Sequence, residues 1–91
     1  MRENLLKIIN YYGVLPQLKY FQSEVYELTE AILEERYWEG TKEHITEEIA
    51  DVKVMLDQFI EYYELDRDEI YEIWCNKIDR QLDRIAEENK K

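Results

Sequence analysis

Residues 16–37 read PQLKYFQSEVYELTEAILEERY, and their apolar side chains recur at spacings of three and four positions. This period places the apolar side chains on one side of an α-helix, because a helix completes a turn in 3.6 residues. Pro16 suits the first turn of such a helix, where an N–H group would have no partner. The stretch therefore predicts a long amphipathic helix with an apolar stripe of Leu18, Phe21, Val25, Leu28 and Ile32.

The same period occurs on both sides of this segment. Residues 3–12 form a shorter amphipathic segment, and Gly13 is expected to end it. Residues 42–63 form a second long segment, which follows a predicted loop at 38–41. The apolar stripe of this second long helix consists of Ile45, Ile49, Val52, Leu56, Phe59 and Tyr63.

A fourth helix is predicted to begin at Asp66, because an acidic residue three positions later, here Glu69, is typical of a capped helix start. Four helices with short connections predict an all-α fold, a four- to five-helix bundle or hairpin assembly. The length of the chain indicates a single domain that spans residues 1–91. The apolar edge of the fourth helix consists of Ile70, Trp74, Ile78 and Ile85.

The composition excludes several classes of protein. Of 91 residues, 22 are acidic and 12 basic, and the formal net charge of -10 argues against nucleic-acid and anionic membrane partners. Two glycines and one proline are too few for the turns of a β-sandwich or barrel. A single cysteine excludes a disulfide framework and fits a reducing compartment. No stretch is long and apolar enough for a signal peptide or a membrane span, so we expect a cytoplasmic protein.

Two pairs of carboxylates lie beside the apolar stripes of the two long helices. Glu24 and Glu27 share one flank of the first stripe, and Glu48 and Asp51 share one flank of the second. At 100° per residue, the four acids fall roughly 60–130° from the centre of their stripe. Antiparallel packing of the two helices would bring these flanks together. Four neighbouring carboxylates repel one another, and Mg²⁺ is the hard cation that usually relieves such repulsion inside cells.

The acid spacing also has a simpler interpretation. Pairs three positions apart recur elsewhere, for example at Glu61 with Glu64, and they are typical of a solvated helix face. Two observations favour a metal site: the pairs lie on consecutive long helices, and each borders the predicted core.

A basic cluster lies on the fourth helix. Lys77, Gln81 and Arg84 share a sector of the helix roughly 60° wide. In so acidic a chain, this cluster is a candidate phosphate clamp. The alternative is that these bases favour the helix dipole and pair with Asp79 and Asp83.

Together these segments resemble the MazG-like all-α NTP pyrophosphohydrolases. Residues 17–28 resemble the first helix motif of that family and residues 47–52 resemble the second. The family pattern is ExxE, a variable gap, and then ExxD. Its four acidic positions match Glu24, Glu27, Glu48 and Asp51.

The basic cluster adds a third motif to this resemblance, which covers roughly residues 14–86. Lys77, Gln81 and Arg84 resemble the K-xxx-N-xx-R tail of the family, with Gln81 standing where Asn is commoner. Ser23 stands where the family often has a second Glu.

The resemblance implies a Mg²⁺-dependent enzyme, with Mn²⁺ as a substitute ion. It implies hydrolysis of a nucleoside triphosphate, NTP or dNTP, between the α- and β-phosphates, which releases a nucleoside monophosphate and pyrophosphate. In this interpretation the catalytic, metal-binding acids are Glu24, Glu27, Glu48 and Asp51, and the phosphate-binding residues are Lys77, Gln81 and Arg84.

Many aromatic side chains in so short a chain favour a homodimer or homotetramer. Two other classes of function stay open. One is a non-catalytic helical module that binds metal or another protein, and the other is an acidic bundle that captures a basic protein. Metal binding without hydrolysis would indicate the first, and partner capture that weakens strongly with salt would indicate the second.

Overall fold

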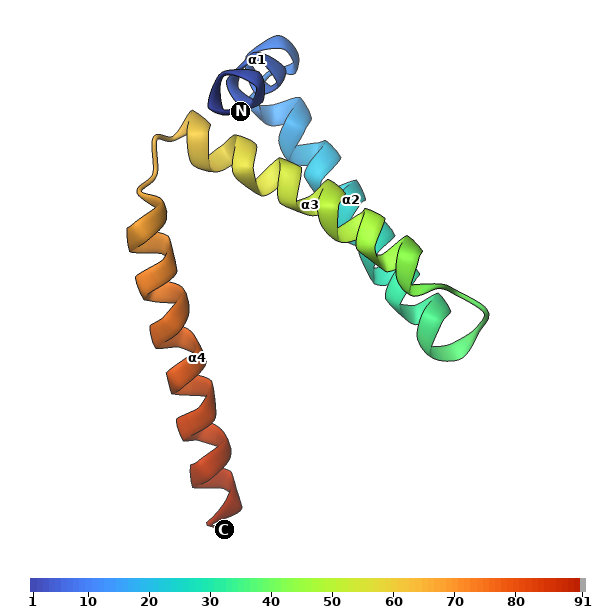
Figure 1. The fold of residues 1–91 in the computed structure, drawn as a ribbon, viewed down its shortest axis with the longest axis vertical. Coiled ribbons are helices and arrows are strands. Elements are labelled where there is room, and N and C mark those ends of the chain that lie inside the picture. The colour runs from blue at the N-terminus through green and yellow to red at the C-terminus, as the bar shows by residue number, and fades with distance from the viewer. Residues whose placement is uncertain (91) are drawn as a thin grey trace.

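The computed structural model describes residues 1–90, and this part of the chain is entirely helical (Figure 1). The last residue of the predicted domain, Lys91, lies outside the described residues. None of the described helices is long and apolar enough to cross a lipid bilayer. The all-α prediction is therefore confirmed, with helices α1 (Arg2–Tyr12), α2 (Val14–Tyr37), α3 (Lys42–Tyr62) and α4 (Arg67–Asn89).

The helix boundaries follow from local chemistry. Gly13 separates α1 from α2 at φ 95°, a left-handed conformation that glycine adopts without a steric cost. The Thr41 hydroxyl caps α3 by accepting a hydrogen bond from the backbone N–H of His44 at 3.1 Å. The carboxylate of Asp66 caps α4 by accepting from the backbone N–H groups of Asp68 and Glu69. The predicted caps at Gly13 and Asp66 are thus confirmed.

The first three helices pack together, and α2 and α3 run antiparallel along most of their length (Figure 1). The short connection at residues 38–41 joins these two helices at one end, and α1 crosses them at the other. The rings of Phe21 and Phe59 meet edge to face across the α2–α3 seam, with centroids 5.7 Å apart. This hairpin, covered at one end by α1, carries the core of the described chain.

The fourth helix does not complete a closed bundle. It leads away from the hairpin, and the C-terminus lies at its far end (Figure 1). Every residue of α4 except the half-buried Cys75 is exposed. The predicted apolar edge on this helix therefore faces solvent in the isolated chain, where Trp74 stacks only on its neighbour Tyr71.

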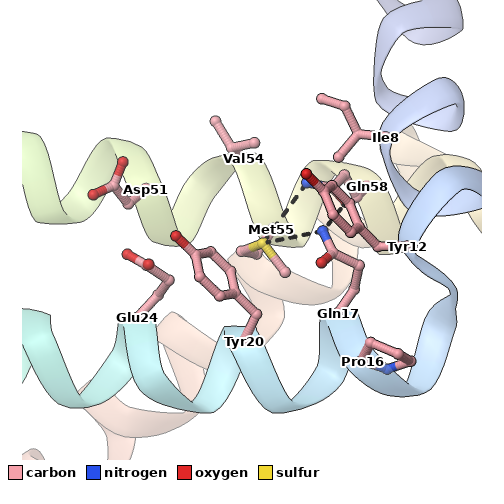
Figure 2. Close-up of a pocket in the computed structure, with 10 residues that line it drawn as sticks. All are labelled: Ile8, Tyr12, Pro16, Gln17, Tyr20, Glu24, Asp51, Val54, Met55 and Gln58. Atoms are coloured by element: carbon pink, nitrogen blue, oxygen red, sulfur yellow. Dashed lines mark hydrogen bonds between the residues drawn. The ribbon is translucent and has the colours of Figure 1, made fainter.

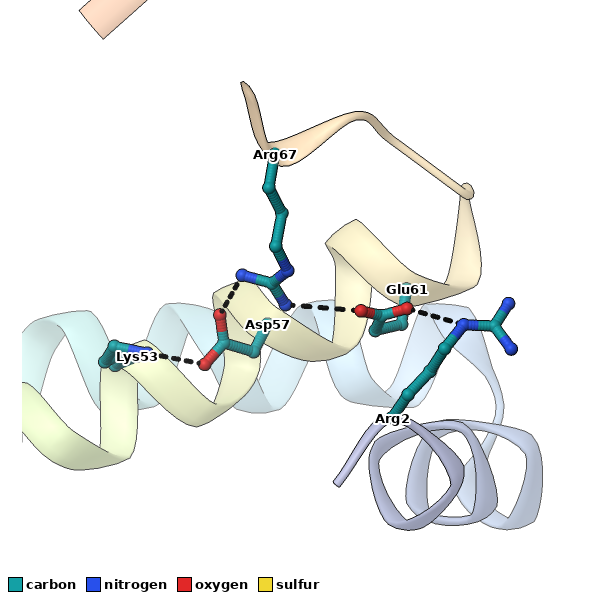
Figure 3. Close-up of polar contacts among 5 residues, drawn as sticks. All are labelled: Arg2, Lys53, Asp57, Glu61 and Arg67. Atoms are coloured by element: carbon teal, nitrogen blue, oxygen red, sulfur yellow. Dashed lines mark hydrogen bonds and ion pairs between the residues drawn. The ribbon is translucent and has the colours of Figure 1, made fainter. Parts of the chain in front are cut away.

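An ion-pair network fixes the start of α4 to the end of α3 (Figure 3). The Arg67 guanidinium donates to Asp57 at 3.1 Å and to Glu61 at 3.4 Å. Lys53 also donates to Asp57, and Arg2 of α1 donates to Glu61 at 2.9 Å. Partial burial opposes the charged form of Asp57, yet the hydrogen bonds from Lys53 and Arg67 hold its pKa below the ordinary value. Paired charges therefore join the start of α4 to α3.

The buried face of α2 differs from the predicted stripe. Leu18, Val25 and Ile32 lie on the predicted stripe but are exposed, whereas Gln17 and Glu24 are buried. The face that packs is rotated roughly 50° from the predicted stripe toward the acids. This helix carries apolar residues over a wide sector, and the part of the sector that contacts α3 is not its centre.

The same rotation occurs on α3. Ile49 and Leu56 are exposed, although both lie on the predicted stripe, while Glu48, Met55 and Gln58 are buried. Glu24 and Glu48, which were expected on the flanks of the seam, therefore lie within it.

The isolated chain exposes more surface than a folded protein of its mass. Its accessible surface is 7801 Å², against about 5,700 Å² for a monomeric globular chain of this size. Its radius of gyration is 16.8 Å, against about 12 Å for a compact domain of 91 residues. Among the described residues, the fully buried hydrophobic side chains are Ile9, Ala31 and Met55. Much of the apolar surface is thus left without a covering partner.

Candidate functional site

Three of the predicted acids meet in the α2–α3 seam. Glu24 and Glu27 of α2 and Glu48 of α3 each offer a carboxylate oxygen, and these oxygens lie within 4.8 Å of one another. Glu24 and Glu48 are buried, and Glu27 is exposed. Asp51, the fourth predicted acid, is also exposed, and it faces Glu24 across the seam (Figure 2). The three-residue spacing within each pair, together with the antiparallel packing of α2 and α3, thus places all four acids in one region.

Two carboxylate oxygens in this cluster have no partner. Oε2 of Glu24 and Oε2 of Glu48 are buried, and no described residue donates a hydrogen bond to either. A buried acceptor without a donor is costly, and it is costlier when the group carries charge. These two oxygens require either a proton or a cation.

Burial and mutual repulsion act on the ionisation of these acids. Burial raises the pKa of Glu24, and the charges of Glu27 and Asp51 add to this effect, while a hydrogen bond from Tyr20 acts in the opposite direction. Burial also raises the pKa of Glu48, again with help from the neighbouring carboxylates, while His44 acts in the opposite direction. The His44 Nδ1 lies 3.9 Å from Oε1 of Glu48, too far for a strong hydrogen bond. The protein therefore supplies little positive charge to this cluster.

The donor set fits Mg²⁺. Carboxylate oxygens are its preferred protein ligands, and each ligand lies about 2.1 Å from the ion. Adjacent oxygens around an octahedral ion are therefore about 3.0 Å apart, and opposite ones about 4.2 Å apart. The three carboxylate oxygens lie within 4.8 Å of one another, which is close to these separations. Small side-chain movements would bring Glu24, Glu27 and Glu48 to coordination distance.

The predicted phosphate-binding residues lie elsewhere in the chain. Lys77, Gln81 and Arg84 line a small hollow of about 140 Å³ on α4, together with Arg80. They do share one face of the helix, as their spacing predicts. No packing of α4 brings this face to the carboxylates of the same described chain.

A larger pocket of about 550 Å³ adjoins the acid cluster (Figure 2). Glu24 and Asp51 line one end of it, and Gln17 and Gln58 line the other. The Tyr20 hydroxyl points toward the carboxylates, and Glu24, as a hydrogen-bond acceptor and as a negative charge, raises the pKa of Tyr20.

Sequence reasoning missed this pocket. The available signal was a repeated seven-residue spacing, from Gln17 to Glu24 on one helix and from Asp51 to Gln58 on the other. Seven residues are nearly two helical turns, so each amide lies on the same face as an acid.

Comparison with known proteins adds no relative: no protein-family model, curated protein or solved structure matches this chain. The resemblance to the MazG-like enzymes therefore stays a prediction from the motifs. The geometry of the seam is an observation independent of these motifs.

Proposed function

We propose that this protein is a Mg²⁺-dependent nucleoside triphosphate pyrophosphohydrolase. The observation that carries the proposal is the group of facing carboxylates in the seam, where two buried oxygens lack any donor. A cluster of this kind is stable in its charged form only with a cation, and Mg²⁺ bound by carboxylates is a frequent partner of polyphosphates. The resemblance in motif order supports the same activity.

The residues divide into two roles. Glu24, Glu27, Glu48 and Asp51 would hold Mg²⁺, with Mn²⁺ as a substitute, at the mouth of the seam. A bound ion would neutralise phosphate oxygens, favour the ionisation of water and stabilise the charge of the transition state. The unprotonated carboxylates also orient an attacking water molecule as hydrogen-bond acceptors.

Lys77, Gln81 and Arg84 provide the second role, the binding of phosphate oxygens. Arginine matches the geometry of a phosphate with two parallel hydrogen bonds, while lysine contributes a point charge. Their common face and shared hollow support this assignment. Because this face does not reach the acids of its own chain, we propose that a second copy of the chain brings the two together.

The exposed surface supports such a homodimer or homotetramer. The excess over a compact monomer is about 2,000 Å² per chain, which matches what each partner buries in an obligate dimer. The acidic hairpin and the basic face of α4 are electrostatically complementary. Sedimentation equilibrium should therefore give a mass of at least two chains, and a monomeric mass at micromolar concentration would contradict the proposal.

Pyrophosphate release from a panel of NTPs and dNTPs tests the activity itself. We expect one or more nucleotides to yield the monophosphate and pyrophosphate with Mg²⁺, and no product with EDTA. Identification of both products by chromatography distinguishes this cleavage from removal of the γ-phosphate. If no nucleotide is hydrolysed with Mg²⁺ or Mn²⁺, the enzyme proposal is refuted.

A non-catalytic metal-binding or protein-interaction module is the second candidate. The observation that favours it is the separation of α4 from the acid cluster within one described chain. This alternative requires Mg²⁺ to bind at the seam without any turnover of nucleotides. The same panel, combined with a metal-binding measurement, separates the two candidates.

A further inference from the structure

The pocket beside the acid cluster contains a pair of buried side-chain amides. Gln17 is 7% exposed and Gln58 is 1% exposed, and they project from facing helices (Figure 2). Nε2 of Gln17 donates to Oε1 of Gln58 at 2.8 Å. The pair lies at the end of the pocket opposite Glu24 and Asp51.

This hydrogen bond leaves much of the polar capacity of the pair unused. Each primary amide has two N–H donors and an acceptor oxygen with two lone pairs. The amide nitrogens of Gln17 and Gln58 also approach the Met55 sulfur, at 3.9 and 3.7 Å, but a thioether is a weak acceptor. Strong donors and acceptors therefore remain available side by side at the end of the pocket.

The rest of the lining suits a flat and largely apolar group. The rings of Tyr12 and Tyr20 lie along the pocket, and Ile8, Pro16 and Val54 complete its apolar wall. A volume of about 550 Å³ lies within the range of small-molecule sites, which are typically apolar with a few placed polar groups. A planar heterocycle would contact the tyrosine rings and present its polar edge to the amides.

The distance between the two ends of the pocket matches the length of a nucleotide. Gln17 and Glu24 are separated by seven residues of α2, which corresponds to about 10 Å along the helix axis. In a nucleotide, a sugar separates the base from the phosphates by a distance of this order. Negative phosphates with a cation fit the acidic end, and a neutral base fits the amide end.

We propose that this pocket holds the base of the nucleotide and that Gln17 and Gln58 recognise its hydrogen-bonding edge. The proposal rests on the proposed function, whose substrate it describes further. An amide places a donor beside an acceptor, the same arrangement that glutamine uses when it pairs with the edge of a base. Replacement of one amide should therefore change the relative affinity for different bases more than it changes the cleavage of the phosphates.

NMR of the side-chain amides tests the pocket without metal and without hydrolysis. Uridine, cytidine, adenosine and guanosine are titrated to millimolar concentration into the ¹⁵N-labelled full chain in EDTA. We expect saturable shifts of the side-chain NH₂ signals of Gln17 and Gln58, with one nucleoside binding at least several-fold more tightly than another. Unmoved signals with all four nucleosides, or equal affinity for all four, would overturn the proposal.

Two variants sharpen this test. Gln17→Met keeps the length of the side chain and removes its polar atoms, and Gln22→Met is the matched control at an exposed position of α2. We expect Gln17→Met to remove most of the preference among nucleosides, and Gln22→Met to leave it unchanged. If Gln17→Met does not fold, the amide signals of the unmodified chain still decide the question.

The outcomes also separate this proposal from the proposed function. Nucleoside binding at the amide pair without any pyrophosphate release would refute the enzyme and retain the pocket. Hydrolysis of nucleotides with silent amide signals would refute the pocket and retain the enzyme.

Discussion

Replacement of Glu48 by glutamine should reverse the effect of Mg²⁺ on stability. In the metal-free protein, Glu48 is a buried carboxylate with an unpartnered oxygen and acidic neighbours. Glutamine has the same shape without the charge, so the metal-free variant should melt at a higher temperature than the unmodified protein. With Mg²⁺ the order should invert, because only the unmodified protein gains from the ion.

The magnitude follows from linkage between binding and folding. At a Mg²⁺ concentration ten times the Kd, the folded state gains about 1.4 kcal/mol. In a domain of this size, 1 kcal/mol corresponds to a shift in Tm of roughly 4–8 °C. The unmodified protein should therefore gain roughly 6–11 °C at that concentration, and Glu48→Gln should gain little.

The dependence on pH gives the same prediction a second readout. The raised pKa values of Glu24 and Glu48 mean that the folded state retains protons that the unfolded state has lost. This contribution to metal-free stability is fully present below the ordinary value of 4.5 and is lost as the pH rises through the raised values. Mg²⁺ competes with these protons, so its stabilising effect should increase over the same range.

Differential scanning fluorimetry with and without Mg²⁺, between pH 4.5 and 8, measures both effects. Glu47→Gln is the matched control, because it removes the same charge at an exposed neighbouring position outside the cluster. An equal response to Mg²⁺ in Glu48→Gln and in the unmodified protein would refute a metal site in the seam. A metal-free Glu48→Gln that melts lower than Glu47→Gln would refute the argument from buried charge.

Two further predictions concern the second copy and the hairpin loop. Glu48→Gln and Arg84→Ala should each be inactive, but refolding an equal mixture of the two should recover about a quarter of the activity. Half of the dimers are then mixed, and each mixed dimer has one intact site out of two. No recovery would mean that both residues act in the same chain. Gly40→Ala should lower the free energy of unfolding by about 1–3 kcal/mol in chemical denaturation. The added Cβ would lie 2.6 Å from the backbone nitrogen of Glu35. Glu39→Ala, in the same loop, is the control and should have little effect.

The helices and their ends were predictable because they depend on local chemistry. The apolar period needs only neighbouring residues, and the caps at Gly13, Thr41 and Asp66 act within one turn. Sequence also predicted that Glu24 and Glu48 would approach each other, since a short loop between two long helices enforces an antiparallel hairpin.

The packed faces were not predictable in the same way. Leu18 and Ile49 belong to the predicted stripes, yet both are exposed, because each helix carries apolar residues on more than the side that meets its neighbour. A single sequence gives the width of an apolar sector but does not divide it between contacts inside the chain and contacts with another copy. The position of α4 was unpredictable for the same reason. Arg67 contacts α3 at the start of this helix, and nothing in the described chain covers its apolar edge.

The polar composition of the seam is the strongest argument that it binds a ligand. Gln17, Glu24, Glu48 and Gln58 are all buried, so the described chain buries more polar than hydrophobic side chains. Leucines at these positions would stabilise a hairpin that had only to fold, since buried charged groups are often replaced by apolar ones without loss. The seam therefore has a pattern that folding alone does not explain.

The order of these groups along the seam narrows the class of ligand. The carboxylates lie together, and the neutral amides lie about two helical turns away, beside α1. A ligand that binds at both ends of the pocket needs two parts. One part is strongly negative and binds the carboxylates through a bridging cation, and the other is neutral and presents hydrogen-bond donors and acceptors to the amides on one edge. Inorganic polyphosphate satisfies only the first end and a free base only the second. A nucleotide satisfies both, so the two amides make the acidic cluster a more specific indication of function than its charge alone.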